Sequence, residues 1–258
     1  MRLEDKKEHI LDFVIRDYIE TAQPVSSGRI SDKQSSAGSP ATIRGIMLSL
    51  DEDGYLYQPH TSSGRAPTER GYRYFIDNLV GKPKASSKNS LLALSVSLAL
   101  NPLYGGSDAH TRYGKHSHFS EFSADALGSL VNDFAHELGM FASAMIEGKR
   151  GMREFAGFHD VLSEPEFHEG DMLLDFGRMV DDIDSVMSEY RNALIDEEDE
   201  YNVWIGRENI YPGARKGSTL VARISLPEAS ELTFFAYGPT RMNYEKAIFK
   251  IKSLIEEI

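Results

Sequence analysis

The sequence predicts an α+β protein of two domains, and three observations lead to this fold class. In the first 80 residues, apolar side chains recur mainly at helical spacings of three and four. Residues 81–90, Gly-Lys-Pro-Lys-Ala-Ser-Ser-Lys-Asn-Ser, form a hydrophilic stretch typical of a linker. After the linker, long helical patterns give way to short β-rich runs near the C-terminus. We therefore expect domains at 1–80 and 91–258.

The first domain begins with three predicted helices. The first covers residues 4–21, and a shorter second one follows a serine cap at Ser26 or Ser27 and ends near residue 33. Ser39 followed by Pro40 predicts the start of the third, because serine caps a helix and proline fits its first turn. This third helix is expected to end near Glu52.

A short strand, a polar loop and a fourth helix complete the first domain. Residues 55–58 read Tyr-Leu-Tyr-Gln and predict the strand, while residues 59–67 have the polar, glycine-bearing composition of a hairpin tip. A fourth helix is expected after Thr68. This order of helix, helix, turn, helix, strand and loop predicts a winged helix-turn-helix.

The second domain contains both helical apolar patterns and β-rich runs. Long helices are expected over 124–147 and 171–195, and residues 91–120 give no clear pattern. Three short β-rich runs and a final helix follow, at 201–205, 220–226, 232–237 and 244–258.

Composition and charge limit the possible functions. The chain has no cysteine, which excludes disulfides, thiolate metal sites and cysteine nucleophiles. Its formal net charge is −12, yet residues 1–90 hold 13 Lys and Arg against 12 Asp and Glu. Binding to nucleic acid is therefore expected only in the first domain. The charged N-terminus does not resemble a signal peptide, and the apolar run 91–100 is too short to span a membrane. We expect a cytoplasmic protein.

The third helix is the predicted DNA-reading element. Ile43, Ile46, Met47 and Leu50 share one arc, which predicts the buried face. The opposite face would then enter the major groove, where arginine makes bidentate contacts with guanine. Small side chains would let the helix approach closely, and hydroxyls would reach phosphate or a base edge. The candidate DNA-binding residues of this helix are Ser39, Ala41, Thr42, Arg44 and Gly45.

The predicted wing supplies a second set of candidates. Hydroxyls and backbone N–H groups suit phosphate, and an arginine here suits the minor groove. The simpler alternative is that the arginines are ordinary solvated side chains. The candidates are His60, Thr61, Ser62, Ser63 and Arg65, extended by Arg70 and Arg73 at the start of the next helix.

These segments resemble a known family of repressors. The segments are Asp17–Val25 (DYIETAQPV), Ser39–Arg44 (SPATIR), Leu50–Leu56 (LDEDGYL), Gln58–Thr68 (QPHTSSGRAPT) and Gly71–Tyr74 (GYRY). Near the C-terminus, Leu162–Phe167 (LSEPEF), Trp204–Asn209 (WIGREN) and Tyr237–Tyr244 (YGPTRMNY) continue the likeness. Together they resemble the heat-inducible transcription repressor HrcA family.

The resemblance implies a GAF-like second domain and a role as repressor of heat-shock chaperone genes. Such repressors bind an inverted-repeat operator as homodimers, and a chaperonin keeps them active. Two departures stand out. The family continues its recognition helix with Arg-Asn-Glu-Met, whereas Gly45 and Ile46 follow Arg44 here. The family also carries an inserted dimerisation domain, whereas residues 147–150 pass almost directly to the Leu162 segment, which predicts a shortened member.

Besides the repressor, which is the first choice, two other functions remain open at this point. A small molecule that enters the GAF-like domain would make the protein a ligand-responsive regulator. An enzyme with an appended DNA-binding domain is the third choice, because the sequence has no phosphate loop, nucleophile elbow or dinucleotide fingerprint. No cofactor is expected. His110, His116 and His118 form a weak metal candidate without carboxylates at a telling spacing.

Overall fold

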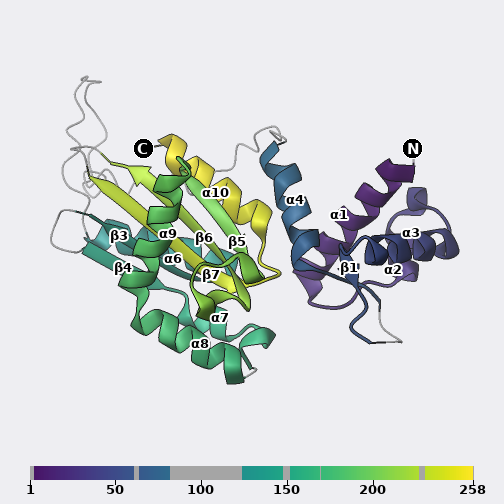
Figure 1. The fold of residues 1–258 in the computed structure, drawn as a ribbon, viewed down its shortest axis with the longest axis horizontal. Coiled ribbons are helices and arrows are strands. Elements are labelled where there is room, and N and C mark those ends of the chain that lie inside the picture. Colours follow the sequence, from purple (N-terminus) through teal and green to yellow (C-terminus); the bar gives the residue numbers. More distant parts are fainter. Residues whose placement is uncertain are drawn as a thin grey trace, which may run out of the picture. The chain divides into compact units, whose positions relative to one another are not determined.

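The computed structural model describes residues 3–60, 64–81, 124–147, 152–168, 170–226 and 230–257 (Figure 1). The chain divides into two compact units. The first consists of residues 1–85 with the short segments 205–207 and 240–245. The second consists of residues 86–204, 208–239 and 246–258. The linker was expected at 81–90, but Gly81 is the last residue of a helix, and residues 82–90 lie outside the described residues. The unassigned stretch 91–120, with the histidines at 110, 116 and 118, lies outside them too.

The first unit contains every helix predicted for it and a two-stranded sheet. Strands β1 and β2 pair antiparallel, with Leu56 opposite Pro67 and Tyr57 opposite Ala66. The strand expected over four residues is therefore only two residues long. The elements are α1 (Leu3–Thr21), α2 (Ser27–Lys33), α3 (Pro40–Glu52), β1 (Leu56–Tyr57), β2 (Ala66–Pro67) and α4 (Glu69–Gly81), with a short 3-10 helix, η1 (Ser35–Ala37), between α2 and α3.

Glycines shape the chain reversal after α3. Gly54 adopts a positive φ of 78°, so its N–H bonds Asp51 and the N–H of Tyr55 reaches back to Leu50. This pattern closes the end of a helix and turns the chain into β1. At Gly71 a Cβ would lie 2.4 Å from the carbonyl oxygen of Tyr55. Only glycine therefore permits α4 to begin this close to the strand.

The second unit is built around a five-stranded sheet in the order β4-β3-β7-β6-β5. Strand β3 is antiparallel to both β4 and β7, and β6 is antiparallel to β7. This mixture of helices with an antiparallel sheet confirms the α+β prediction. The strands are β3 (Phe141–Ile146), β4 (Met152–Ala156), β5 (Tyr201–Ile205), β6 (Gly217–Ser225) and β7 (Glu231–Pro239).

Helices pack on both faces of this sheet (Figure 1). On one face, Phe176 and Tyr190 belong to a core that includes Phe235 and Tyr237 of β7. On the other face, Phe134 of α6 packs on Phe234, with ring centroids 4.5 Å apart. The helices are α6 (Ala124–Leu138), α7 (Phe158–Leu162), α8 (Gly170–Asp181), α9 (Ile183–Asp196) and α10 (Tyr244–Glu257). In the described parts of the chain, no helix is both long and apolar enough to cross a membrane.

Two helix predictions for this unit were wrong. The helix expected over 124–147 ends at Leu138, because Gly139 takes a φ of 63° and Phe141 starts β3 instead. The apolar residues after Gly139 fit a helix as well as a strand, and pairing with β7 makes them a strand. The helix expected over 171–195 is two helices, separated at Asp182, whose φ of −102° and ψ of 16° interrupt the α-helix.

The resemblance led us to expect that this chain lacks the inserted domain of the family, and the hairpin of β3 and β4 lies at that point of the sequence. Ile146 lies opposite Met152 in this antiparallel pair. Residues 147–151 alone connect the two strands, so no domain is inserted at this point.

Candidate nucleic-acid interface

Helix α3 begins with the cap that the sequence predicts. The Ser39 hydroxyl accepts a hydrogen bond from the Thr42 backbone N–H at 3.3 Å and lies 3.0 Å from the Thr42 hydroxyl. Pro40 follows in the first turn. Both candidate hydroxyls are exposed, and each already has a partner within the cap. The cap holds the first turn of α3 in place.

The two faces of α3 are those expected. Ile43, Ile46, Met47 and Leu50 are buried, which confirms the predicted inner face. On the outer face Arg44 is exposed, and no acidic side chain of the described residues pairs with it. Leu48, one turn later, is 49% exposed. A Cβ at Gly45 would have no heavy atom within 4 Å, so the helix surface is open there. Ala41 and Thr42 are exposed on the first turn.

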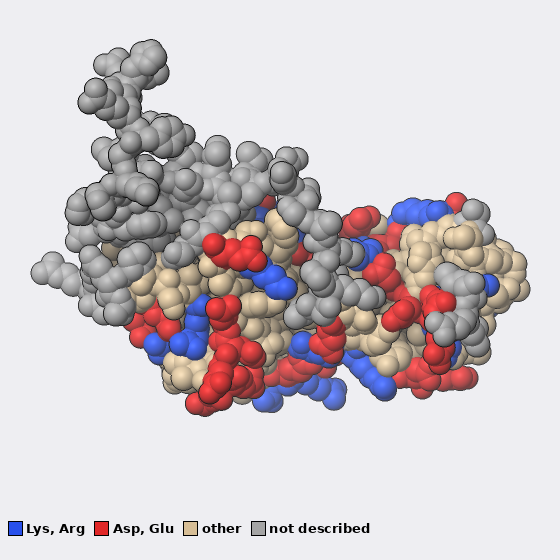
Figure 2. All heavy atoms as spheres, turned by 90° about the horizontal axis from the view of Figure 1, so that it is seen from above, with Lys and Arg blue, Asp and Glu red and all other residues tan. Residues whose placement is uncertain are grey.

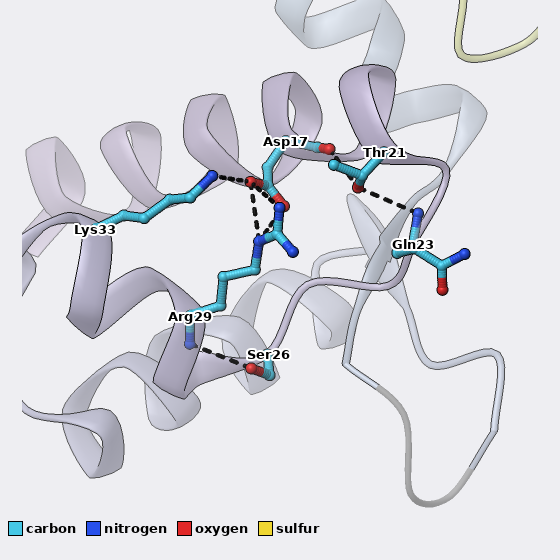
Figure 3. A network of polar contacts seen from close by, with 6 residues as sticks. All are labelled: Asp17, Thr21, Gln23, Ser26, Arg29 and Lys33. Atoms are coloured by element: carbon cyan, nitrogen blue, oxygen red, sulfur yellow. Dashed lines mark hydrogen bonds and ion pairs between the residues drawn. The ribbon is translucent and has the colours of Figure 1, made fainter.

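A buried carboxylate fixes the angle between α1 and α2 (Figure 3). Asp17 of α1 is only 4% exposed. Arg29 Nε lies 3.0 Å from one of its oxygens and 2.8 Å from the other, and Lys33 Nζ lies 2.9 Å from the first. Sequence reasoning missed this cluster. The available signal was the spacing of Arg29 and Lys33, which places both on one side of α2.

The wing candidates do not behave alike. Thr61, Ser62 and Ser63 lie outside the described residues, and His60 is exposed beside them. Arg65 is not at the tip. Its backbone bridges to Val25, and its guanidinium pairs with Asp51 of α3 at 3.1 Å, with 16% of the side chain exposed. This ion pair attaches the base of the wing to α3, and a contact of Arg65 with the minor groove stays a prediction.

The two arginines of α4 also differ from each other. Arg70 is exposed and lies over the ring of Tyr55, 4.7 Å from the centroid. Arg73 is partly buried, and its guanidinium lies 3.8 Å from Asp77 one turn later. The ring of Tyr55 therefore holds the charge of Arg70 at the surface, whereas the carboxylate of Asp77 partly compensates the charge of Arg73.

Charge is distributed locally on the surface. On the face drawn in Figure 2, basic and acidic side chains of the described residues are interspersed, and no broad basic area is visible there. The attraction between a cation and a phosphate decays over about 8 Å at cellular salt, so distant acidic side chains have little effect on it. A few cations that lie close to the duplex can therefore still bind DNA. An interface on this protein would be a small one centred on named residues.

The polar groups inside the second unit are mostly structural. The Tyr190 hydroxyl donates to Asn209 Oδ1 at 2.8 Å, and burial raises the pKa of Tyr190 to about 12. Lys250 is 4% exposed and lies 2.6 Å from Glu137. Burial lowers the pKa of Lys250, although the bond to Glu137 opposes that shift. Within the part of the chain that the structure describes, no group of three His, Asp or Glu residues is placed to hold a metal ion.

Comparison with known proteins identifies the family. The family model described as the HrcA protein C terminal domain matches residues 107–248. That range is more than half of the chain. The chain belongs to the HrcA family.

Curated relatives carry the name heat-inducible transcription repressor HrcA. The one from Pelotomaculum thermopropionicum is 48% identical over 92 residues, which is 36% of this chain and 26% of the relative. The one from Alkaliphilus metalliredigens is 37% identical over 132 residues, 51% of this chain and 35% of the relative. The chain thus spans about a third or less of the curated relatives it matches.

A solved structure has a similar fold. A crystal structure of a hypothetical protein superposes with a TM-score of 0.72 and 16% sequence identity, covering 99% of this chain and 98% of that one. The HrcA family is one of transcription repressors rather than of enzymes. Its relatives act in transcription regulation and the heat-shock response, as the resemblance led us to expect.

Proposed function

We propose that this HrcA-family chain is a sequence-specific DNA-binding repressor of heat-shock genes, which binds an inverted-repeat operator as a homodimer in the cytoplasm. Its reading element is a winged helix-turn-helix in residues 1–80. The observation that carries the proposal is the outer face of α3, where an exposed Arg44 without an acidic partner among the described residues stands beside an open Gly45.

The chemistry of this face suits the major groove. Arg44 supplies two parallel donors for guanine O6 and N7, which is worth about 1–3 kcal/mol of discrimination. Gly45 and Ala41 have no large side chain, so the backbone of α3 can approach the bases closely. Leu48 offers an apolar surface of the kind that contacts a thymine methyl group. The mixture suits base reading better than uniform phosphate binding.

Backbone contacts are assigned to the surrounding residues. Ser39 and Thr42 present exposed hydroxyls at the first turn of α3, and His60 is exposed after β1. Arg70 adds an exposed charge at the start of α4. These groups would set the register on the duplex, because phosphate contacts position a protein without reading sequence. Arg65 is left out of the interface and assigned to the wing base.

The decisive experiment is a selection of bound sequences from random duplex DNA with the full chain. We expect enrichment of an inverted repeat whose half-sites lie about 34–36 Å apart or a multiple of that distance. The matched control is Arg44→Ala, which should fold normally because the side chain contacts no described acidic group. No enrichment with the wild-type chain would overturn the proposal.

A second candidate is a small-molecule-responsive regulator, and one observation favours it. The hydroxyl of Tyr237 on β7 is buried and has no hydrogen-bond partner among the described residues. Burial raises the pKa of this group. An unpaired buried hydroxyl is costly unless a water or a ligand bonds to it. A compound that raises the Tm of the wild-type chain, but not that of Tyr237→Phe, would support this function. Equal shifts in both proteins would contradict it.

A further inference from the structure

Helix α8 carries an apolar strip on its solvent side. Its inner face is complete, with Met172, Phe176 and Met179 buried. Leu173 and Leu174 nevertheless remain 45% and 60% exposed. Single exposed apolar residues are common on protein surfaces, but contiguous ones mark places where another molecule binds.

Glycines flank this strip. At about 100° per residue, Gly170, Leu174, Gly177 and Asp181 fall on one row along the outer face of α8. A Cβ would meet no heavy atom within 4 Å at either glycine. Glycine inside a helix costs up to about 1 kcal/mol relative to alanine. The row therefore alternates a protruding leucine with open positions, a shape into which another helix can pack.

We propose that this row of α8 is a docking surface for a second copy of the same chain. The two helices pack antiparallel across a twofold axis that passes between Leu174 and Gly177. Leu174 of each copy then lies over Gly177 of the other, as an isologous contact requires. The proposal rests on the proposed function, because an inverted repeat needs two reading units in one complex.

The charges of α8 select the antiparallel arrangement. Asp171 and Arg178 lie on the same polar side of the row and are 92% and 72% exposed. Within the chain, Asp171 lies 3.8 Å from Lys216 and Arg178 lies 3.6 Å from Asp175, so both are in exposed ion pairs that a second copy can exchange for new ones. In the antiparallel pair, Asp171 of one copy and Arg178 of the other are offset by only about 3 Å along the axis, since two residues rise by that distance. Asp181 approaches Gly170 at the positive N-terminal end of the second helix. A parallel pair would instead place Asp171 opposite Asp171.

The first test measures dimerisation of the full chain by sedimentation equilibrium. We expect Leu174→Asp to weaken the dimer at least about ten-fold, because it places an unpaired charge at the centre of the contact. The side chain is mostly exposed, so circular dichroism should stay unchanged. The matched control is Ile195→Asp on α9, which is 39% exposed and should leave the dimerisation constant within about two-fold of the wild-type value.

The second test exchanges charges between copies. Asp171→Arg and Arg178→Asp should each dimerise poorly alone, because like charges then meet across the axis. Mixed in equal amounts, the two variants should form a heterodimer, since both of its pairs are again of opposite sign. Mass spectrometry of the intact complex distinguishes the heterodimer from either homodimer.

The outcomes separate this inference from the proposed function. A wild-type chain that stays monomeric, a Leu174→Asp chain that dimerises normally, or a mixture without heterodimer would each overturn the docking surface. Binding to a duplex with one half-site reports the reading unit alone. If Leu174→Asp weakens the dimer while the wild-type chain shows no sequence preference, the docking surface stands and the repressor function fails.

Discussion

Helices α3 and α8 are built alike on the inside and differently on the outside. Each buries one apolar arc in the core of its own unit. The outer face of α3 shows Arg44 beside small residues, whereas that of α8 shows two leucines beside open glycines. The inner arc stabilises the unit, while the outer face indicates the partner. We assign DNA to the first and a second copy to the second.

The largest expected effect is on α3. Arg44→Ala should reduce discrimination between the selected operator and scrambled DNA by about 1–3 kcal/mol, because the bidentate contact to guanine is lost. Competition binding at fixed salt measures the ratio. Lys82→Ala in the linker is the control and should leave the ratio nearly unchanged. If Arg44→Ala kept the wild-type ratio, the assignment of α3 as the DNA-reading helix would be wrong.

A smaller effect is expected at the wing base. Arg65→Ala should lower the free energy of unfolding by about 1–2 kcal/mol, because Asp51 loses a mostly buried partner. Urea unfolding measures the change. The operator-to-scrambled ratio should remain that of the wild-type chain when binding is measured well below the melting temperature. Loss of discrimination without loss of stability would return Arg65 to the interface.

Two glycines provide a matched pair that tests the comparison directly. Gly45→Ala and Gly177→Ala should each stabilise the folded monomer by up to about 1 kcal/mol, because both sites are open and alanine favours helix. Gly45→Ala should weaken binding to a single half-site and leave dimerisation unchanged. Gly177→Ala should weaken dimerisation and leave binding to a single half-site unchanged. Thermal unfolding, half-site binding and sedimentation measure the three quantities. Identical behaviour of both variants would mean that the outer faces are not specialised.

The smallest effect concerns an ion pair of the second unit that plays no part in either outer face. Burial alone would raise the pKa of Glu231, but hydrogen bonds from Arg223 and Arg191 lower it below its usual value. A lowered carboxyl pKa contributes stability above the unfolded-state value of about 4.3, and this contribution is lost as the pH falls through the folded-state value.

Glu231→Gln should therefore lower the free energy of unfolding by roughly 1 kcal/mol or less at pH 7. The difference from the wild-type chain should shrink as the pH falls below about 4. Urea unfolding at several pH values measures it, with the exposed Glu189→Gln as control. A difference that stays constant with pH would show that the ion pair is not the source.

The sequence by itself determined the helices of the first unit and the faces of α3. The cap at Ser39, the inner arc of α3 and the reversal at Gly54 each depend on neighbours within a few residues. Local hydrogen bonds and helical periodicity decide such features, so they can be predicted without knowing the rest of the chain. The family resemblance depends on the same local segments.

Only the tertiary structure decided the features that join distant residues. Phe141 and Met145 fit a helical stripe, yet they form β3 because β4 and β7 supply hydrogen-bonding partners on both sides. Arg65 resembles any surface arginine until Asp51 is found beside it, and Arg44 is distinguished from it by having no such partner among the described residues. Pairing across the chain depends on which groups the folded backbone brings within a few ångströms, and no local pattern encodes that.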